Sequence, residues 1–155
     1  MIRTANENDI GALIKLLYQV HEVHSKGRPD IFISGGIKYT EEDLKVILKN
    51  ENTPIFVFEN EENAVLGYAF CEIKETKGDK SLVDRKTLYI DDLCVDENAR
   101  GQRIGTALYN YVVEFAKSIN AHSITLNVWE LNESAKAFYE KCGLSPLKTV
   151  MEQIL

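Results

Sequence analysis

Hydrophobic positions recur along the chain with two periods, and each period predicts a type of secondary structure. Apolar residues that recur every three or four positions predict amphipathic helices. The clearest such stripe consists of Ile104, Leu108, Val112, Phe115 and Ile119. Alternating residues and short apolar runs predict strands. We therefore expect helices after Asn6, at 41–50, after 103 and from Asn132, and strands at 2–5, 54–59, 64–74, 87–95, 123–129 and 147–155.

Turn and capping residues set the boundaries of these elements. Asn6 is followed three residues later by Asp9, and Thr40 by Asp43, which is the spacing of a helix-capping pair. The polar turn 60–63 joins two strands into a β-hairpin, and the polar stretch 75–86 is expected to be a flexible loop. The strands at 87–95 and 123–129 flank a helix, so they should be parallel, with a right-handed crossover.

The first helix should present Ile10, Leu13, Ile14, Leu17, Val20, His21 and His24 on one face. Two histidines at this spacing could share a metal, but no further ligand is obviously placed, so packing is favoured and no metal is expected. The three cysteines lack CxxC spacing, which argues against a disulfide framework and a zinc site. We expect Cys71, Cys94 and Cys142 to be small buried hydrophobic residues.

Composition limits the classes of function. The chain has 155 residues, of which 45% are hydrophobic, so a single domain over 1–155 can bury one core. The net charge of −6 argues against sequence-independent nucleic-acid binding. The N-terminus has no apolar signal region, and no apolar run approaches the roughly 20 residues of a membrane span. We therefore expect a cytoplasmic protein that binds neither nucleic acid nor membranes.

The turn before the helix at 104 is basic and contains glycine. It reads Arg100-Gly101-Gln102-Arg103-Ile104-Gly105. The first N–H groups of a helix have no partner within the helix and lie at the positive end of its dipole, so they can bind phosphate. The glycines give phosphate access to the backbone, and the arginines add positive charge. Taken alone, the turn is equally compatible with a solvated loop.

This turn resembles the acetyl-CoA pyrophosphate loop of the GNAT acyltransferase superfamily, usually written Q/R-x-x-G-x-G/A. A second element similar to the family's follows at the right distance, at 132–144 (NESAKAFYEKCGL). One departure is Arg103, which stands where the family usually has glycine and must either point away from the loop or grip the phosphate. The resemblance covers the last two-thirds of the chain well and the first third only by element order. It implies the α+β (α/β) GNAT acyl-CoA N-acyltransferase fold, with a mixed central sheet, flanking helices and the order β-α-α-β-β-β-α-β-α-β.

The resemblance also implies acetyl-CoA as cosubstrate. The residues it assigns to the coenzyme are Leu93, Cys94, Val95, Arg100, Gly101, Gln102, Arg103, Ile104, Gly105, Thr106, Asn132 and Phe138. Within this set, 102–106 would present amides to the pyrophosphate. The backbone at 93–95 would supply donors for the oxyanion where two parallel strands splay apart. Asn132 is explained equally well as a helix cap.

Acyl transfer to an amine requires a proton acceptor, donors for the carbonyl oxygen and a proton for the leaving thiolate. The resemblance implies Tyr139 as the general acid, and Asp91 lines up with the carboxylate that serves as base in some polyamine-acetylating members. Because Asp has a pKa of about 4 and an alkylammonium about 10, this base would need a water relay or desolvation. Successive strand residues face opposite sides, so only one of Asp91 and Asp92 can face the cleft unless a bulge intervenes. Asp92 is assigned a supporting, substrate-side role.

The acceptor side follows from the family as well, where the first helix and the next loop line the cleft. This implies His24, Arg28, Asp30 and Phe32 as residues that select the amine. The acidic net charge suits a cationic acceptor such as a polyamine, an aminoglycoside or a lysine-rich peptide. The family also suggests a homodimer.

Two functions remain after this reading. The first is an acetyl-CoA-dependent N-acetyltransferase that acts on a primary amine of a small molecule, peptide or protein by direct transfer in a ternary complex. The alternative is a non-catalytic acyl-CoA-binding sensor or interaction module of the same fold, and Tyr139 favours the enzyme. A dinucleotide-binding domain is excluded, because Gly101 and Gly105 do not form G-x-G-x-x-G and the turn follows a late strand.

Overall fold

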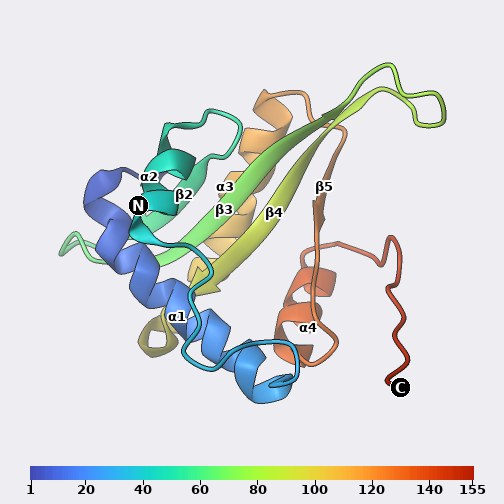
Figure 1. The fold of residues 1–155 in the computed structure, drawn as a ribbon. Coiled ribbons are helices and arrows are strands. Elements are labelled where there is room, and N and C mark those ends of the chain that lie inside the picture. Colours follow the sequence, from blue (N-terminus) through green and yellow to red (C-terminus); the bar gives the residue numbers. More distant parts are fainter.

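The strands of the sheet are ordered in space as they occur in the chain. The computed structural model describes residues 1–155. β1 (Ile2–Thr4), β2 (Ile55–Glu59), β3 (Val65–Thr76) and β4 (Arg85–Val95) pair successively in antiparallel fashion. β5 (Ser123–Leu126) then pairs in parallel with β4 and completes a five-stranded mixed sheet (Figure 1). The predicted hairpin and the predicted parallel pair are confirmed.

Helices cover the two faces of this sheet. α1 (Ile10–Gly27) and α2 (Glu41–Lys49) pack on the face that carries Ile55, Val57 and Tyr68. α3 (Ile104–Ser118) packs on the opposite face, and α4 (Glu133–Lys141) contributes partly buried side chains to the same cluster. Alternate residues of a strand point to opposite faces, so β2 supplies both cores. None of the helices is both long and apolar enough to span a membrane.

Local hydrogen bonds explain where the helices begin. Asn6 and Asp9 form the predicted capping box, although the first turn is a short 3-10 helix, η1 (Glu7–Asp9), that leads into α1. The carboxylate of Asp9 also accepts two hydrogen bonds from Arg3, at 2.8 and 3.0 Å, and so ties β1 to the start of α1. Thr40 and Asp43 form the second predicted box. A second 3-10 turn, η2 (Glu97–Ala99), follows β4.

Several predicted boundaries and faces are wrong. The flexible loop is shorter than 75–86, because β3 and β4 extend into it. The exposed fraction of Ile14 is 37%, whereas Leu16 is buried on the inner face of α1. β5 ends at Leu126 and not at 129, because its pairing with β4 ends there. The predicted strand at 147–155 does not form, since no residue of this segment pairs with the sheet.

Burial is confined to the first three-quarters of the chain. All 26 buried residues lie between Ala5 and Ala116. Cys71 and Cys94 are buried as predicted, but Cys142 is only partly buried. The other residues predicted on the inner face of α4, Ala135 and Phe138, are also only partly buried, and α4 contains no buried residue. The end of the sheet near β5 is therefore much less enclosed than the rest.

Candidate active site

Strands β4 and β5 separate in the middle of β4. They pair only from Thr87 to Ile90 on β4, whereas β4 continues to pair with β3 as far as Val95. The backbone at 91–95 therefore lacks a strand partner on the side of β5. The N–H of Asp96 donates to the carbonyl of Leu66 on β3. Because N–H groups alternate in direction along a strand, those of Leu93 and Val95 point to the open side. This is the divergence that the resemblance implied.

A β-bulge at Asp91 reorients the residues that follow it. Phe70 pairs with Asp92 and Cys71 with Ile90, so Asp91 is an extra residue on β4. The extra residue shifts the alternation by one position and turns Asp92 to the face that carries Cys94. Both carboxylates consequently reach one ammonium group, because Lys38 Nζ lies 3.2 Å from Asp91 Oδ2 and 3.9 Å from Asp92 Oδ2. The bulge is the exception under which both Asp91 and Asp92 were expected to be able to face the cleft.

The two carboxylates differ in their surroundings. Asp91 accepts a hydrogen bond of 2.6 Å from the Tyr39 hydroxyl, and 26% of its side chain is exposed. Asp92 accepts a hydrogen bond of 2.8 Å from the Tyr68 hydroxyl, and only 12% of its side chain is exposed. Burial raises the pKa of Asp92, against the opposing effects of the Lys38 charge and the Tyr68 hydrogen bond. A buried carboxylate of this kind holds its proton more strongly than an ordinary Asp.

Tyr139 lies on α4, next to Phe138. Loss of solvent around this partly buried residue, followed by the negative charge of Asp92, raises the pKa of its hydroxyl well above the usual range. The hydroxyl is therefore protonated at physiological pH.

The basic turn before α3 has the backbone geometry of an anion site. None of the backbone N–H groups from Gly101 to Thr106 donates a hydrogen bond within the chain, and Ala107 is the first residue whose N–H does so. Gly101 has a φ of +83° and Arg103 a φ of +59°, in the left-handed region. Arg103 thus adopts a conformation that glycine reaches more easily, which explains how the turn keeps its shape despite this departure from the family pattern.

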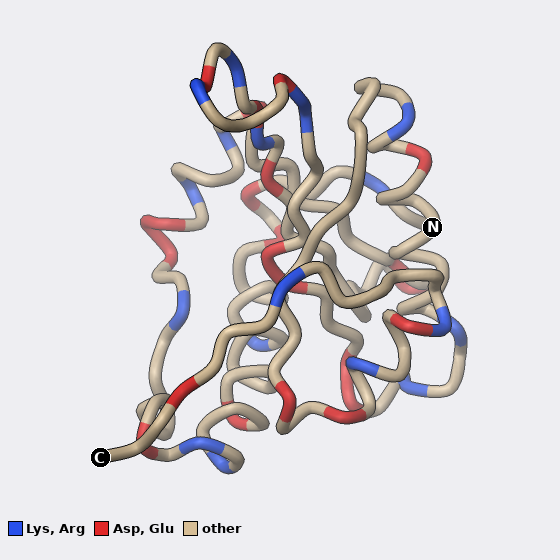
Figure 2. Tube along the Cα trace, turned by 90° about the vertical axis from the view of Figure 1, so that its right-hand side faces the viewer, with Lys and Arg blue, Asp and Glu red and all other residues tan.

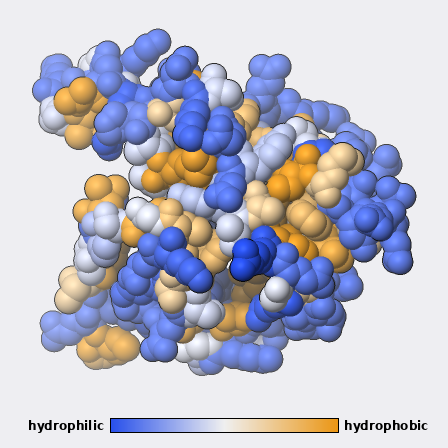
Figure 3. Space-filling view, turned by 180° about the vertical axis from the view of Figure 1, so that it is seen from behind, coloured by the Kyte–Doolittle hydropathy of each residue, from blue (hydrophilic) through white to orange (hydrophobic).

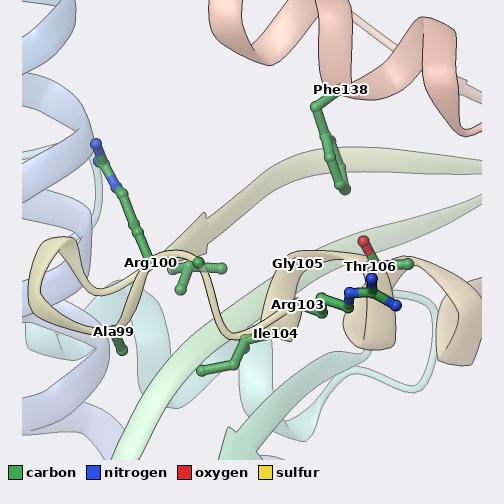
Figure 4. A pocket seen from close by; sticks show the side chains of 9 residues that line it. Ala99, Arg100, Arg103, Ile104, Gly105, Thr106 and Phe138 are labelled. Atoms are coloured by element: carbon green, nitrogen blue, oxygen red, sulfur yellow. The ribbon is translucent and has the colours of Figure 1, made fainter.

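A cavity of about 280 Å³ connects this turn to α4. It is lined by Val95, Ala99, Arg100, Gly101, Arg103, Ile104, Gly105, Thr106 and Phe138. In Figure 4, Phe138 reaches from α4 toward the turn, whereas the Arg100 side chain extends away from it on the side of α1. A Cβ atom added to Gly105 would lie 3.5 Å from Phe138, so a longer side chain there would fill the cavity.

The remaining residues assigned to the coenzyme lie outside this cavity. Asn132 caps α4, because its Oδ1 accepts a hydrogen bond of 3.3 Å from the N–H of Ala135. The thiol of Cys94 is buried on the α1 side of the sheet, 3.8 Å from the carbonyl of Leu16, and burial raises its pKa to about 12. Leu93 and Gln102 do not line the cavity either. Cys94 can therefore contribute only backbone atoms to the cleft.

On the acceptor side, three aromatic rings bridge α1 and the segment after β5. His24 stacks on Phe32 at a centroid distance of 5.1 Å, and Trp129 meets Phe32 edge-on at 5.0 Å. Burial lowers the pKa of His24, and the charges of Lys38 and His21 act in the same direction. Arg28 instead forms hydrogen bonds of 2.8 and 2.7 Å with Asp30, so these two residues satisfy each other.

The histidines of α1 take part in packing. His21 Nε2 lies 2.6 Å from the carbonyl oxygen of Ile33, in the loop after α1. No group of three His, Cys, Asp or Glu side chains is arranged to hold a metal ion.

Sequence reasoning missed four residues around the cleft: Lys38, Tyr39, Tyr68 and Trp129. Lys38 and Tyr39 lie in the irregular segment between α1 and α2. This segment has no periodic pattern from which its path could be predicted. The sequence predicts that Tyr68 lies on a strand, but the hydrogen bond from its hydroxyl to Asp92 depends on the bulge. Trp129 was assigned to a strand, and its contact with Phe32 arises because β5 ends early.

Comparisons with known proteins agree with this geometry. The chain matches the model of the Acetyltransferase (GNAT) family over residues 17–144. It is 25% identical over 149 residues to the Uncharacterized N-acetyltransferase MJ1207 of Methanocaldococcus jannaschii, which covers 96% of this chain and 62% of that protein. The chain thus spans less than two thirds of that relative. It is 26% identical over 159 residues to the thialysine N-epsilon-acetyltransferase of Bos taurus, covering 95% of this chain and 85% of that protein.

Solved structures share the fold. A mutant of the BH1408 protein from Bacillus halodurans is 34% identical and superposes with a TM-score of 0.96, covering 100% of this chain and 99% of the other. An aminoglycoside acetyltransferase from an uncultured soil metagenomic sample, in complex with sisomicin, is 21% identical with a TM-score of 0.74, covering 100% and 94%. Since the family match includes most of the sheet, the pyrophosphate-type turn and α4, the chain belongs to the Acetyltransferase (GNAT) family.

Proposed function

We propose that this protein transfers the acetyl group of acetyl-CoA directly to a primary amine, within a ternary complex. The observation that carries the proposal is the convergence of three features on the open edge of β4. These are the free amides at 101–106, the unpaired backbone at 91–95, and helix α4, whose Phe138 lines one cavity with Val95 and the turn. Family members use acetyl-CoA as cosubstrate, and relatives named for their activity acetylate thialysine and aminoglycosides.

The turn before α3 is proposed to bind the pyrophosphate of the coenzyme. Its N–H groups are not used within the chain, and the dipole of α3 favours negative charge at this end. Arg100 and Arg103 line the cavity and add positive charge. The remaining N–H groups of β4, on Leu93 and Val95, are suitably directed to stabilise the carbonyl oxygen as charge develops on it.

Asp92 is better suited than Asp91 to accept the proton of the amine. Burial raises the pKa of Asp92, which brings it closer to that of an alkylammonium, and a closer match makes proton transfer more efficient. Asp91 is more exposed and is shared by Tyr39 and Lys38, so we assign it to holding a positive charge of the acceptor. Tyr139 supplies the proton to the leaving thiolate.

The contacts of Lys38 support a cationic acceptor. Its ammonium group lies within 4 Å of both carboxylates and balances their negative charge. The ammonium group of an amine substrate would balance the same charge in the same place. The pair is 37% and 26% exposed for Lys38 and Asp91, so its strength is modest and an incoming amine can displace it. We therefore place the reacting amine of the substrate beside Asp91 and Asp92.

Binding of acetyl-CoA, measured by calorimetry, tests the coenzyme site. We expect micromolar affinity that is lost in the Gly105→Glu variant, because the new side chain fills the cavity next to Phe138. Gly11→Glu is the matched control, since Gly11 lies on α1 with nothing within 4 Å of an added Cβ. Equal affinity in all three proteins, or no affinity in the unmodified chain, would contradict the assignment.

Release of free thiol in the presence of an amine library tests turnover. We expect polyamines and other cationic amines to react faster than neutral ones. Binding of acetyl-CoA with no thiol release for any amine would favour the alternative of an acyl-CoA-binding module. Asp91→Asn and Asp92→Asn separate the two carboxylates: the first should raise KM, whereas the second should lower kcat and remove the acidic limb of the pH–rate profile.

A further inference from the structure

Lys38 is a primary amine that the chain itself places beside the two carboxylates of β4. Its Nζ lies 3.2 Å from Asp91 Oδ2 and 3.9 Å from Asp92 Oδ2, and 37% of its side chain is exposed. No other lysine lies within 4 Å of two different carboxylates. An amine of the chain therefore already occupies the place assigned above to the reacting amine of a substrate.

The residue after Lys38 anchors this part of the chain to the sheet. The hydroxyl of Tyr39 donates a hydrogen bond of 2.6 Å to Asp91, and its ring stacks on Phe70 of β3 at a centroid distance of 5.7 Å. Phe70 in turn pairs with Asp92 across the two strands. The backbone beside Lys38 is thus fixed against the bulge, whereas the four-carbon stem of its side chain stays flexible.

The open backbone of β4 begins next to this amine. Leu93 directly follows Asp92, and its N–H points to the side that β5 leaves open. Neighbouring residues of a strand are about 3.3 Å apart along its axis, so a carbonyl group that accepts a hydrogen bond from the N–H of Leu93 lies close to Asp92. Rotation about the side-chain bonds of Lys38 brings its Nζ toward such a carbonyl.

We propose that the protein acetylates its own Lys38. This inference rests on the proposed function, because it uses the same coenzyme site and the same proton acceptor. Asp92 takes a proton from the ammonium group of Lys38, Nζ forms a bond to the carbonyl carbon of acetyl-CoA, and the carbon–sulfur bond breaks. The new amide loses its extra proton to water, and Tyr139 protonates the thiolate. Asp92 and Tyr139 then exchange protons with water, so the net products are acetyl-lysine, CoA and a proton.

The other lysines of the chain measure the acetylation that occurs without catalysis. The chain has 18 lysine and arginine residues, and Figure 2 shows them spread along its whole length. Hydrophilic residues also dominate the surface seen from behind (Figure 3). Lys45 is the matched comparison, because its Nζ also lies 3.2 Å from a carboxylate, that of Glu41, and 44% of its side chain is exposed. Acetyl-CoA reacting from solution should therefore modify Lys45 and Lys38 at similar rates.

Mass spectrometry after incubation with acetyl-CoA alone tests the proposal. We expect one acetyl group per chain, which peptide mapping places on Lys38, formed about 10²-fold faster than at Lys45, as for a reaction with general-base catalysis. Lys38→Arg should abolish it, since a guanidinium keeps the charge but not the reactive amine. Asp92→Asn and Gly105→Glu should lower the rate at Lys38 to that at Lys45, because they remove the proton acceptor and fill the coenzyme cavity.

The state of Lys38 before incubation is mapped in the same way. An acetyl group already present at Lys38 supports the proposal if it is missing from the purified Asp92→Asn protein, and contradicts it if both proteins carry it equally.

The protein concentration distinguishes transfer within one chain from transfer between chains. With saturating acetyl-CoA, the first-order rate constant at Lys38 should not depend on the protein concentration, and a rate constant that rises with it would overturn the proposal. Equal rates in the unmodified and Asp92→Asn proteins would do the same. Acetylation of added amines with none at Lys38 would overturn this inference and leave the proposed function standing, whereas acetylation of neither would overturn both.

Discussion

The two ends of the sheet differ in how completely their own chain encloses them. From β1 to β4, helices α1, α2 and α3 cover both faces, and every one of the 26 buried residues belongs to this part, between Ala5 and Ala116. Around β5 and α4, no residue is buried, the strands diverge, and the last segment makes a single ion pair.

The difference separates folding from function. The enclosed part is held by dense packing, which fixes the positions of Asp91, Asp92 and the turn before α3. The open part carries Tyr139, Phe138 and the free edge of β4, where a ligand can reach backbone groups. A site between the two parts combines residues held rigidly by packing with backbone groups that a ligand can reach. Functional sites need both properties.

Tyr139→Phe should give the largest effect, and it should affect activity alone. Loss of a general acid typically lowers kcat by about 10²- to 10⁴-fold. The substitution removes only the hydroxyl and keeps the ring, so thermal stability should stay nearly unchanged. Initial rates of thiol release and melting temperatures check both expectations, with the exposed Tyr111→Phe on α3 as control. A kcat within twofold of the unmodified enzyme would exclude Tyr139 as the acid.

Leu108→Ala should give the largest loss of stability. Leu108 on α3 has an exposed fraction of 0%, and truncation of such a leucine costs about 3 kcal/mol in the free energy of unfolding. Leu144→Ala, at the partly buried end of the molecule, should cost less than about half of that. Urea unfolding measures both values. Equal losses at the two positions would show that the end near β5 is as tightly packed as the core.

Arg103→Gly should stabilise the protein while weakening coenzyme binding. Glycine removes the strain of a φ of +59°, so the free energy of unfolding should rise by about 0.5–1 kcal/mol. Loss of one charged hydrogen bond to phosphate should lower the affinity for acetyl-CoA by about tenfold. Asn63→Gly, at a φ of +60°, is the control and should change stability less, because asparagine tolerates this conformation.

The sequence predicted the enclosed part of the fold better than the open part. Periodicity located α1 to α3 and the strands β1 to β4, because their buried faces impose a regular pattern. The capping residues Asn6 and Thr40 located two helix starts. The segment 147–155 has the composition of a strand but no partner within its own chain, so its pattern predicted an element that does not form.

The candidate site shows a similar division. The turn before α3 and Phe138 could be found from local motifs, and the structure brings them together in one cavity. The relation of Asp91 to Asp92 could not be predicted, because it depends on a single-residue bulge opposite Phe70 and Cys71. The loop that delivers Lys38 to these carboxylates has no periodic pattern at all.

Lys38→Met should lower KM for a cationic amine and so test the acceptor site at the junction of the two parts. Removing the ammonium group that contacts Asp91 at 3.2 Å leaves this carboxylate free for a substrate cation. An ion pair of this exposure contributes about 0.2–1 kcal/mol, so KM for a cationic amine should fall by roughly 1.4- to fivefold. Lys45→Met is the control, because Lys45 forms a similar pair with Glu41 on α2. A higher KM would instead make Lys38 part of the acceptor site.

His24→Phe should give the smallest effect, on the pH dependence of stability. Burial lowers the pKa of His24 from its ordinary value of 6.5, so below that value the unfolded chain binds a proton that the folded chain does not. Stability is therefore lost as the pH falls below about 6.5, and this loss should shrink when phenylalanine keeps the stacking on Phe32 without a titrating group. Melting temperatures at about pH 7.5 and 5.5 measure the difference, with the exposed His122→Gln as control. Acidic groups titrate alike in both proteins and do not affect the comparison. If the melting temperatures of the two proteins changed equally between these pH values, His24 would be accessible to protons in the folded state. The aromatic contacts between His24, Phe32 and Trp129 would then open in solution.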